Sequence, residues 1–360
     1  MPDLTIAAST LSTAMAFAAR VTEPRNTIPI IANVCLKASG GTLTITTTDL
    51  DNWFSQPIAA DGDMDATVDS IRFAAIITAC SGRVTLSLDN NRMTIKSGRS
   101  RWQLPSLPSS DFPFMVPDGL CKPVKLVGSA LASAIGRISS AITVSQSRPY
   151  LGGAFLDGEG GKLRMTATDG QRCVVCEPGA AWPKDAATVI VPVKLLKLLA
   201  AIAATMEGEV SLSWSDTKFQ AILGDVTLTG KLIDGQFPDY RRIIPAPVNA
   251  PVMFDPDALR QALRRVALVE SEKTRVVKLD IADGRVAVSI SANSGEGNEE
   301  VPASFENDAR VGFNVTYLAE MLESIGGETV EMHLAQEKKV ALFRPAVANG
   351  AFGFLGTFQI

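Results

Sequence analysis

The sequence predicts an α+β protein of three similar domains, each with antiparallel sheets and with helices on one side. Three observations predict this class. A unit of about 120 residues recurs three times without a gap, each copy reads as two helices among short strands, and turn signals separate those strands. The unit is longer than a solenoid repeat and large enough for a core of its own. We therefore expect domains at 1–120, 121–248 and 249–360.

The first strand and first helix of each copy carry the recurrence. Apolar residues alternate at the start of the unit and then recur at helical spacing. The equivalent positions are Leu4, Ile6, Leu11, Met15 and Ala18; Val124, Leu126, Leu131, Ile135 and Ile138; and Val252, Phe254, Leu259, Leu263 and Val266.

Alternating strands follow this helix, and a second helix comes later in each copy, again followed by paired strands. The first set of strands ends in a polar pair, at Thr48–Asp49, Thr168–Asp169 and Ala292–Asn293. The second helix is expected near 71–80, 193–204 and 316–325. Each copy is therefore a doubled β-α-β-β-β unit. The segments that join the copies, 113–123 and 245–251, are short and rich in Pro, which predicts a fixed arrangement of the domains.

The composition excludes several classes of protein. Hydrophobic residues make up 46% and charged residues 20% of the 360, as in an ordinary globular chain. No run of about 18 apolar residues is present, and Met1-Pro2-Asp3 does not begin like a signal peptide, so we expect a cytoplasmic protein. Five cysteines do not make a disulfide scaffold. The net charge of −4 restricts any nucleic-acid contact to local patches.

Few residues suggest catalysis or metal binding. His333, the single histidine, lies in an alternating run and is interpreted as a strand-surface residue. Cys173 and Cys176 form one CxxC without a second pair, which favours two small apolar strand residues over a zinc or redox site. The segment 61–65 begins like a calcium loop but lacks the required glycine and final glutamate, so an acidic surface turn is expected. We expect no cofactor, no metal and no enzymatic activity.

Positive side chains gather on the predicted helices of this net-acidic chain. The plain interpretation is a solvated helix face, and the sharper one is a set of helices that face phosphates. The residues concerned are Arg20, Arg25, Arg137, Lys194, Lys197, Arg260 and Arg264.

Together the motifs resemble one family along essentially the whole chain: the bacterial DNA sliding clamp, the β subunit of DNA polymerase III. Each motif alone is weak, but their joint order and their fit to the triplication are specific. The matching stretches are 25–30 (RNTIPI), 97–101 (SGRSR), 111–113 (DFP), 147–151 (SRPYL), 167–172 (ATDGQR), 234–242 (DGQFPDYRR) and 272–275 (EKTR).

The resemblance implies the DNA clamp fold, in which a head-to-tail homodimer closes a ring with helices lining the hole and sheets at the rim. It implies a DNA polymerase processivity factor that slides on double-stranded DNA without reading its sequence. The implied partners are the DNA polymerase III alpha subunit, the clamp loader and other replication and repair proteins with a clamp motif, and no membrane. A closed ring holds DNA by topology, so weak phosphate contacts suffice.

The resemblance also assigns site residues. DNA contacts fall on Arg25, Tyr150 and Lys194, with a further polar contact at Ser145 or Gln146. A hydrophobic pocket for partner peptides is implied, although in a generic domain these residues would be loop and core packing. The implied pocket residues are Leu151, Thr168, Gly170, Arg172, Cys173, Pro238, Arg242, Ile243 and Phe358.

The implied dimer interface joins the first domain of one copy to the third domain of the other. An apolar centre with complementary charges suits such a contact, with two glutamates facing two arginines. The first-domain residues are Ile76, Arg99, Arg101, Trp102 and Leu104, and the third-domain residues are Leu268, Val269, Glu299 and Glu300.

The chain departs from the family pattern in three places. The family usually ends in a Val-Met-Pro-Met-Arg-Leu-like tail that forms one pocket wall, whereas this chain ends in 354–360 (FLGTFQI). Phe358 and Ile360 are expected to supply the apolar contacts instead. Gln171 stands where histidine is common, and Pro149 where tyrosine is frequent.

Two other functions stay open from the sequence. One is a monomeric clamp-fold scaffold that binds proteins without encircling DNA. The other is a hydrolase or redox enzyme that uses Cys173 and Cys176.

Overall fold

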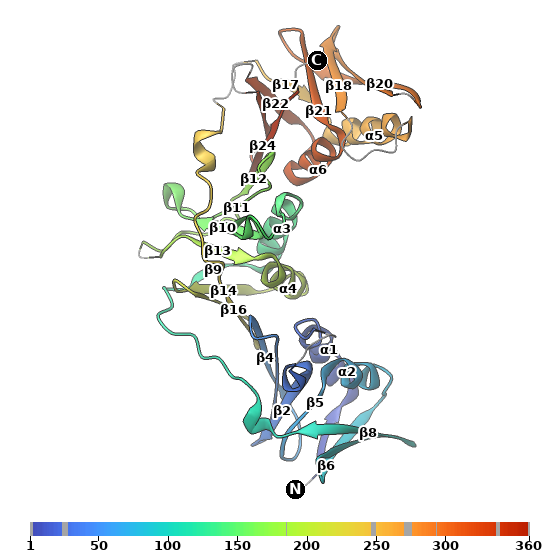
Figure 1. Cartoon of the computed structure of the whole chain (residues 1–360), viewed down its shortest axis with the longest axis vertical. Coiled ribbons are helices and arrows are strands. Elements are labelled where there is room, and N and C mark those ends of the chain that lie inside the picture. Colours follow the sequence, from blue (N-terminus) through green and yellow to red (C-terminus); the bar gives the residue numbers. More distant parts are fainter. Residues whose placement is uncertain are drawn as a thin grey trace. The chain divides into compact units, whose positions relative to one another are not determined.

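The computed structural model describes residues 3–23, 28–184, 186–245, 250–269, 276–292, 294–335 and 339–358. The chain forms two compact units. Unit 1 comprises Met1–Ala132, Pro183–Ala187 and Lys194–Leu232, and unit 2 comprises Ser133–Trp182, Thr188–Val193 and Ile233–Ile360. Each unit contains one twelve-stranded antiparallel sheet with helices beside it (Figure 1).

In unit 1 the strand order is β1-β6-β7-β8-β5-β2-β3-β4-β16-β15-β14-β9. The strands are β1 (Leu4–Ala7), β2 (Asn33–Ser39), β3 (Thr42–Thr48), β4 (Asn52–Ala59), β5 (Met64–Asp69), β6 (Arg83–Asp89), β7 (Arg92–Ser97), β8 (Ser100–Leu107), β9 (Val124–Val127), β14 (Glu209–Trp214), β15 (Lys218–Leu223) and β16 (Val226–Lys231). The helices are α1 (Ala8–Ala18), α2 (Ser70–Thr78) and, but for its first residue, α4 (Val193–Ala203), with 3₁₀ turns η1 (Pro29–Ala32) and η2 (Ser109–Asp111). Helices α1 and α2 pack together (Figure 1).

In unit 2 the strand order is β13-β10-β11-β12-β24-β23-β22-β17-β20-β19-β18-β21. The strands are β10 (Gly153–Asp157), β11 (Arg164–Thr168), β12 (Arg172–Cys176), β13 (Val189–Pro192), β17 (Val252–Phe254), β18 (Val276–Ala282), β19 (Arg285–Ala292), β20 (Gly295–Ser304), β21 (Ala309–Asn314), β22 (Val330–Ala335), β23 (Val340–Pro345) and β24 (Ala351–Gly356). Helices α5 (Pro256–Val266) and α6 (Val315–Ile325) pack together, and α3 (Gly128–Ile138) is divided between the units. The 3₁₀ turns are η3 (Ser139–Ala141), η4 (Pro149–Leu151), η5 (Glu159–Gly161), η6 (Tyr240–Arg242) and η7 (Ala267–Val269).

The helices form where apolar spacing and capping residues predict them. Asp69, Asp255 and Asn314 precede α2, α5 and α6, and each side chain accepts a hydrogen bond from a backbone N–H of the first turn. The apolar positions found in the sequence, such as Leu259 and Leu263, are fully buried. The predicted α+β class with antiparallel sheets is confirmed, and so are the second helices of the three copies.

Each sheet continues from one sequence copy into the next. In unit 1, β4 pairs with β16, and Trp53 lies opposite Thr229. In unit 2, β12 pairs with β24, and Cys173 lies opposite Phe354. We call the β4–β16 seam and its flanking contacts the first joint, and the β12–β24 seam the second joint. Because every strand at a joint keeps its ladder of hydrogen bonds, each seam is part of a sheet rather than a loose contact.

His333 corrects an expectation from the sequence. It was expected on a strand surface, but only 4% of it is exposed, and its Nε2 lies 3.3 Å from Oε2 of Glu331. Its neighbour Met332 is buried as well, so both faces of β22 are covered at this point. The alternation of residue types along this strand therefore could not show whether either of its faces is exposed.

In the acidic segment 61–65, residues 61–63 form the turn between β4 and β5, and Met64 and Asp65 already belong to β5. Asp61 exchanges two backbone hydrogen bonds with Thr5, and its carboxylate pairs with Arg83 at 2.7 Å. Both members of this pair are exposed, in line with a surface turn. Among the described helices, none is long and apolar enough to cross a membrane.

Candidate functional site

The turn before β12 is fixed by its own side chains. The Thr168 hydroxyl donates to the Arg172 carbonyl at 2.6 Å and accepts from the Gly170 N–H at 3.1 Å. One Asp169 oxygen accepts from the N–H groups of Gln171 and Arg172 at 2.9 and 3.0 Å. Gly170 has φ of +93°, which favours glycine. The backbone of Arg172 is therefore held in place before its side chain makes any contact.

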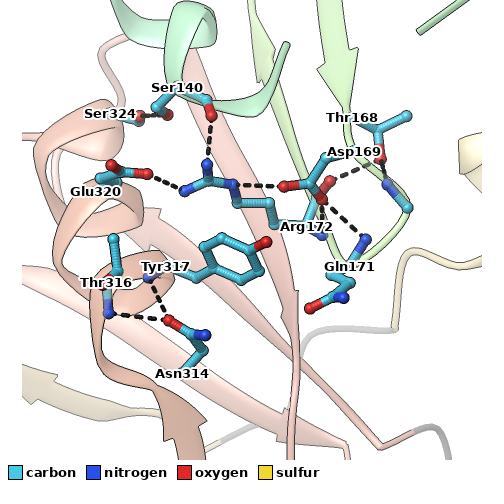
Figure 2. Close-up of polar contacts among 11 residues, drawn as sticks. Ser140, Thr168, Asp169, Gln171, Arg172, Asn314, Thr316, Tyr317, Glu320 and Ser324 are labelled. Atoms are coloured by element: carbon cyan, nitrogen blue, oxygen red, sulfur yellow. Dashed lines mark hydrogen bonds and ion pairs between the residues drawn. The ribbon is translucent and has the colours of Figure 1, made fainter. Parts of the chain in front are cut away.

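The Arg172 side chain is buried, and each of its three nitrogens donates a hydrogen bond (Figure 2). Nε donates to the Asp169 carboxylate at 3.0 Å, Nη1 to Glu320, and Nη2 to the carbonyl of Ser140. The guanidinium carbon lies 4.2 Å from the centroid of the Tyr317 ring, within cation–π range. Arg172 thereby links β12 to η3 and α6.

Tyr317 comes from the first turn of α6. The Asn314 Oδ1 accepts hydrogen bonds from the N–H groups of Thr316 and Tyr317 at 3.0 and 3.1 Å (Figure 2). This cap satisfies donors that a helix start otherwise leaves unpaired. The half-buried Tyr317 is thus held through its backbone by Asn314 and through its ring by Arg172.

A cavity of about 500 Å³ lies beside these residues, entirely within unit 2, and its lining is mostly apolar. A cavity of this size and composition suits a small ligand or one or two side chains of a docked peptide. Seven of the nine predicted pocket residues line it: Leu151, Thr168, Gly170, Arg172, Pro238, Ile243 and Phe358.

The other two predicted pocket residues lie elsewhere. Cys173 is behind the lining, in a buried cluster with Leu151 and Tyr240. The Arg242 side chain is 85% exposed, pairs with Asp239 at 2.8 Å, and does not line the cavity. The reason is the three-residue period of a 3₁₀ turn, which puts Tyr240 and Ile243 on the same side and Arg242 off it.

The sequence did not identify several lining residues. Asn314 and Tyr317 belong to the third copy, far along the chain from the peptide-pocket motifs. The signal that could have found Asn314 was its position as a cap before the predicted helix at 316–325. Outside the C-terminal tail, the other lining residues that the sequence did not assign to the pocket are Arg148, Tyr150, Gln171, Tyr240 and Val340.

The divergent tail forms one wall of the cavity. The Gly356 N–H donates to the Gln171 carbonyl at 2.9 Å, and Phe358 exchanges two backbone hydrogen bonds with Gly312 at 2.8 and 3.0 Å. The Phe358 side chain is 47% exposed at the cavity. Gln359 and Ile360, the latter expected to contribute an apolar contact, lie outside the described residues.

Tyr240 is anchored below the cavity. Its hydroxyl donates to the buried Asp157 carboxylate at 3.0 Å, and Arg241 Nη2 reaches the same oxygen at 2.9 Å. Burial of the phenol raises the pKa of Tyr240 to about 12, so the hydroxyl stays protonated and remains a donor. The Tyr240 side chain is therefore a rigid part of the wall.

Two of the three predicted DNA contacts lie within the described residues, Tyr150 in unit 2 and Lys194 in unit 1. Arg25 lies outside the described residues. Tyr150 is half-buried in η4, lines the cavity and packs on the buried cluster beneath it. Lys194, near the start of α4, pairs with Asp49 at 2.5 Å and Glu23 at 2.8 Å.

The pairing of Lys194 is reflected in its titration. Burial disfavours the charged ammonium, but the hydrogen bonds and charges of Asp49 and Glu23 outweigh it and raise the pKa of Lys194. One turn further on, Lys197 is exposed and has no ion-pair partner among the described residues. Lys197 is therefore the freer cation of this helix.

The predicted interface residues lie on two strand edges and their surroundings. β8 pairs with β7 up to Pro105 but with β5 only at Ser106 and Leu107, so in the described chain one edge of 100–105 has no strand partner. Arg99 and Arg101 are exposed there, Ile76 and Trp102 are half-buried, and Leu104 is buried.

The third-copy residues show a matching edge. β20 pairs with β19 along 295–302 but with β17 only at Ala303 and Ser304. Leu268 is 85% exposed and Val269 half-buried. Glu299 pairs with Arg265 at 2.6 Å, and Glu300 lies 3.4 Å from Arg285, so both glutamates already have partners within the chain.

The CxxC residues do not form a reactive pair. Cys173 and Cys176 are three positions apart on β12, so their side chains point to opposite faces of the sheet. Burial raises the pKa of Cys173 well above its ordinary value and that of Cys176 to about 11. Protonated thiols on opposite faces speak against a redox or nucleophilic role.

Solved structures of DNA sliding clamps share this fold. A Caulobacter crescentus beta sliding clamp with bound PEG superposes with a TM-score of 0.93 at 32% identity, covering 99% of both chains. A Pseudomonas aeruginosa sliding clamp bound to griselimycin gives 0.93 at 30% identity, also covering 99% of both chains. The fold therefore defines the chain as a protein of the sliding-clamp class.

Sequence comparisons agree along the whole chain. Beta sliding clamps of Caulobacter vibrioides and Pseudomonas aeruginosa are 34% and 32% identical over 361 and 338 residues, covering 96% and 91% of this chain and 97% and 92% of theirs. Models of the N-terminal, central and C-terminal domains of the DNA polymerase III beta subunit match residues 3–116, 125–239 and 241–352. The chain belongs to the DNA polymerase III beta subunit family, and its function is that of a DNA polymerase processivity factor.

Proposed function

We propose that two copies of this chain close a ring around duplex DNA and that the cavity at the second joint tethers the polymerase. The observation that carries this is the match of three beta-subunit domain models, in order, to one chain with the sliding-clamp fold. The three-domain division at 1–120, 121–248 and 249–360 and the helix-lined hole belong to the proposal. So do a cytoplasmic location and a role without catalysis of its own.

The two open strand edges support closure by a head-to-tail contact. An unpaired edge offers backbone donors and acceptors to another strand. Arg101 lies on β8 and Arg99 in the turn just before it, whereas β20 carries Glu296, Glu299 and Glu300. Opposite charges on two different edges of the same chain favour a heterologous contact, which closes a ring. Glu299 and Glu300 would then share their carboxylates between Arg265, Arg285 and the second copy.

The oligomeric state tests this closure. In solution the protein should have twice the 38.2 kDa chain mass. Leu268→Asp should convert it to a monomer, since a charge would be buried in the interface. Val347→Asp is the matched control, because Val347 is 84% exposed but lies outside the proposed interface. A monomeric unmodified protein would favour the scaffold alternative, and a Leu268→Asp dimer as stable as the control would contradict the proposed interface.

DNA retention tests encirclement itself. Protein loaded on a nicked circle should stay bound in high salt and leave when the circle is cut, since a ring holds DNA by topology. Retention on the linear product would contradict a sliding ring. For phosphate contacts we propose Lys197 and Arg264, which are exposed and lack ion pairs within the described residues, together with Arg25 and Tyr150.

The cavity is proposed as the docking site for the polymerase alpha subunit, the clamp loader and other partners with a clamp motif. Its mostly apolar lining suits one or two apolar anchors of a peptide. Griselimycin, bound in the Pseudomonas aeruginosa clamp structure, is a suitable probe. We expect Ile243→Asp to weaken griselimycin binding at least tenfold by calorimetry, because a ligand in the cavity would have to displace water from the new charge. Arg242→Ala should leave it unchanged, because Arg242 does not line the cavity.

A further inference from the structure

Arg172 lines the docking cavity, yet its polar atoms face the protein. All three guanidinium nitrogens donate to protein oxygens, on Asp169, Glu320 and Ser140 (Figure 2). Only 7% of the side chain is exposed. A ligand in the cavity therefore meets an arginine whose charge is already paired and each of whose nitrogens already donates to the protein.

The three oxygens belong to three separate parts of unit 2. Asp169 lies in the turn before β12, Ser140 in η3, and Glu320 on α6, 148 positions along the chain. A planar group with fixed donor directions can bond all three at once, whereas an ammonium is a single point charge. Arg172 thus fixes α6 relative to the rest of the cavity wall.

The guanidinium also covers one face of Tyr317. Its carbon lies 4.2 Å from the ring centroid, and Tyr317 itself lines the cavity. Asn314 bonds to the backbone of Tyr317, whereas the Arg172 guanidinium packs against its ring and restricts it directly. A ring held in advance loses less conformational entropy when a ligand packs on it.

We propose that Arg172 is a positioning residue of the docking site: it strengthens ligand binding by holding Tyr317 and α6, not by touching the ligand with its charge. This inference rests on the proposed docking function of the cavity. Glu320 belongs to the same device, because it holds Arg172 from the α6 side.

A double-mutant cycle with griselimycin as the probe tests the proposal. Arg172→Ala should weaken binding about tenfold, within the usual range of coupling between residues in contact. Tyr317→Leu should weaken it to a similar degree. If Arg172 acts through Tyr317, the double variant should bind no more weakly than the poorer single variant, and Arg172→Lys should not restore affinity.

Glu320→Gln provides a milder version of the cycle if Arg172→Ala folds poorly. Glu320 is 40% exposed, so the neutral amide is tolerated there, and a severalfold loss is expected that vanishes in the Tyr317→Leu background. Glu323→Gln is the matched control: it lies on the same helix, is 67% exposed and pairs with Arg260 instead. It should leave affinity unchanged.

The outcomes separate this inference from the docking function. Additive losses from Arg172 and Tyr317, or full affinity in Arg172→Ala, would overturn the positioning role, and the docking function would stand as long as Ile243→Asp still weakened binding. Unmodified protein that binds no griselimycin, or binding insensitive to Ile243→Asp, would overturn the docking function of the cavity itself.

Discussion

The first and second joints are built on the same turn but use it differently. In both, a threonine hydroxyl accepts a hydrogen bond from the backbone N–H two residues later. The Leu50 N–H donates to Thr48 at 2.9 Å, and the Gly170 N–H donates to Thr168 at 3.1 Å. In both, the aspartate after the threonine accepts hydrogen bonds from backbone N–H groups, and the strand of the seam, β4 or β12, begins after this turn. The recurrence of Thr48–Asp49 and Thr168–Asp169 in the sequence therefore reflects a shared turn geometry.

The joints diverge at the first residue of the inner strand. Asn52 keeps its amide within the turn, on Asp49 at 3.0 Å, and Lys194 of α4 reaches the same carboxylate. Arg172, at the equivalent position, extends instead to α6. The third residue of the neighbouring helix differs too. Leu195 of α4 is fully buried, whereas Tyr317 of α6 lines the cavity. One long, planar side chain in place of a short amide allows the second joint to hold an aromatic ring at a cavity.

The largest expected effect is on stability at the second joint. Arg172→Ala removes the side-chain donor to Glu320 and to the Ser140 carbonyl and one of the donors to Asp169, at a cost of about 3 kcal/mol. Lys194→Ala should cost about 1 kcal/mol, because Lys194 is 36% exposed and Asn52 still bonds Asp49. Hydrogen exchange of 315–325 and 193–203, with calorimetric unfolding, measures both. Arg242→Ala is the control and should change neither the hydrogen exchange nor the unfolding temperature. Equal losses of stability from Arg172→Ala and Lys194→Ala would contradict the proposed difference between the two joints.

The sequence predicted the helices, the class and most of the cavity, because apolar spacing and short motifs are local signals. It could not predict the contacts of the Arg172 side chain. A charged residue in an implied pocket is interpreted as a ligand contact unless its counter-charge is known, and Glu320 lies 148 positions away. The pairing of Lys194 with Glu23, 171 positions away, could not be predicted either, and the DNA contact that the resemblance assigns to Lys194 stays a prediction. Ion pairs between residues of different sequence copies are set by the fold, and no spacing pattern in the sequence indicates them.

An intermediate effect is expected from acid at the first joint. Burial of the Asp49 carboxyl favours its protonation, but hydrogen bonds from Lys194 and Asn52 outweigh it and lower its pKa below the ordinary 3.8. A lowered carboxyl pKa stabilises the fold fully above the ordinary value, and that contribution is lost as pH falls through the folded-state pKa. The unfolding temperature should therefore fall when the pH is lowered below about 4.

Asp49→Asn isolates this contribution. The variant should be less stable than the parent at neutral pH and should lose less on acidification, when followed by scanning calorimetry from pH 6 to about pH 3. Asp51→Asn is the control, since its pair with Lys231 is exposed on both sides. An Asp49→Asn profile parallel to that of the parent would show that the lysine bridge does not stabilise the first joint.

The smallest effect comes from the turn residue that differs between the joints. Leu50 has φ of +73° and Gly170 of +93°, so the first joint places a branched side chain where the second has glycine. The left-handed conformation costs an L residue about 1 kcal/mol, but glycine is also more flexible in the unfolded chain. Leu50→Gly should therefore change stability by less than about 1 kcal/mol. Gly170→Ala adds strain, and its methyl group would lie 3.0 Å from Arg148 Nη1. Matched calorimetry should show a loss for Gly170→Ala and little change for Leu50→Gly; equal losses would mean that Leu50 stabilises the first joint through its packing.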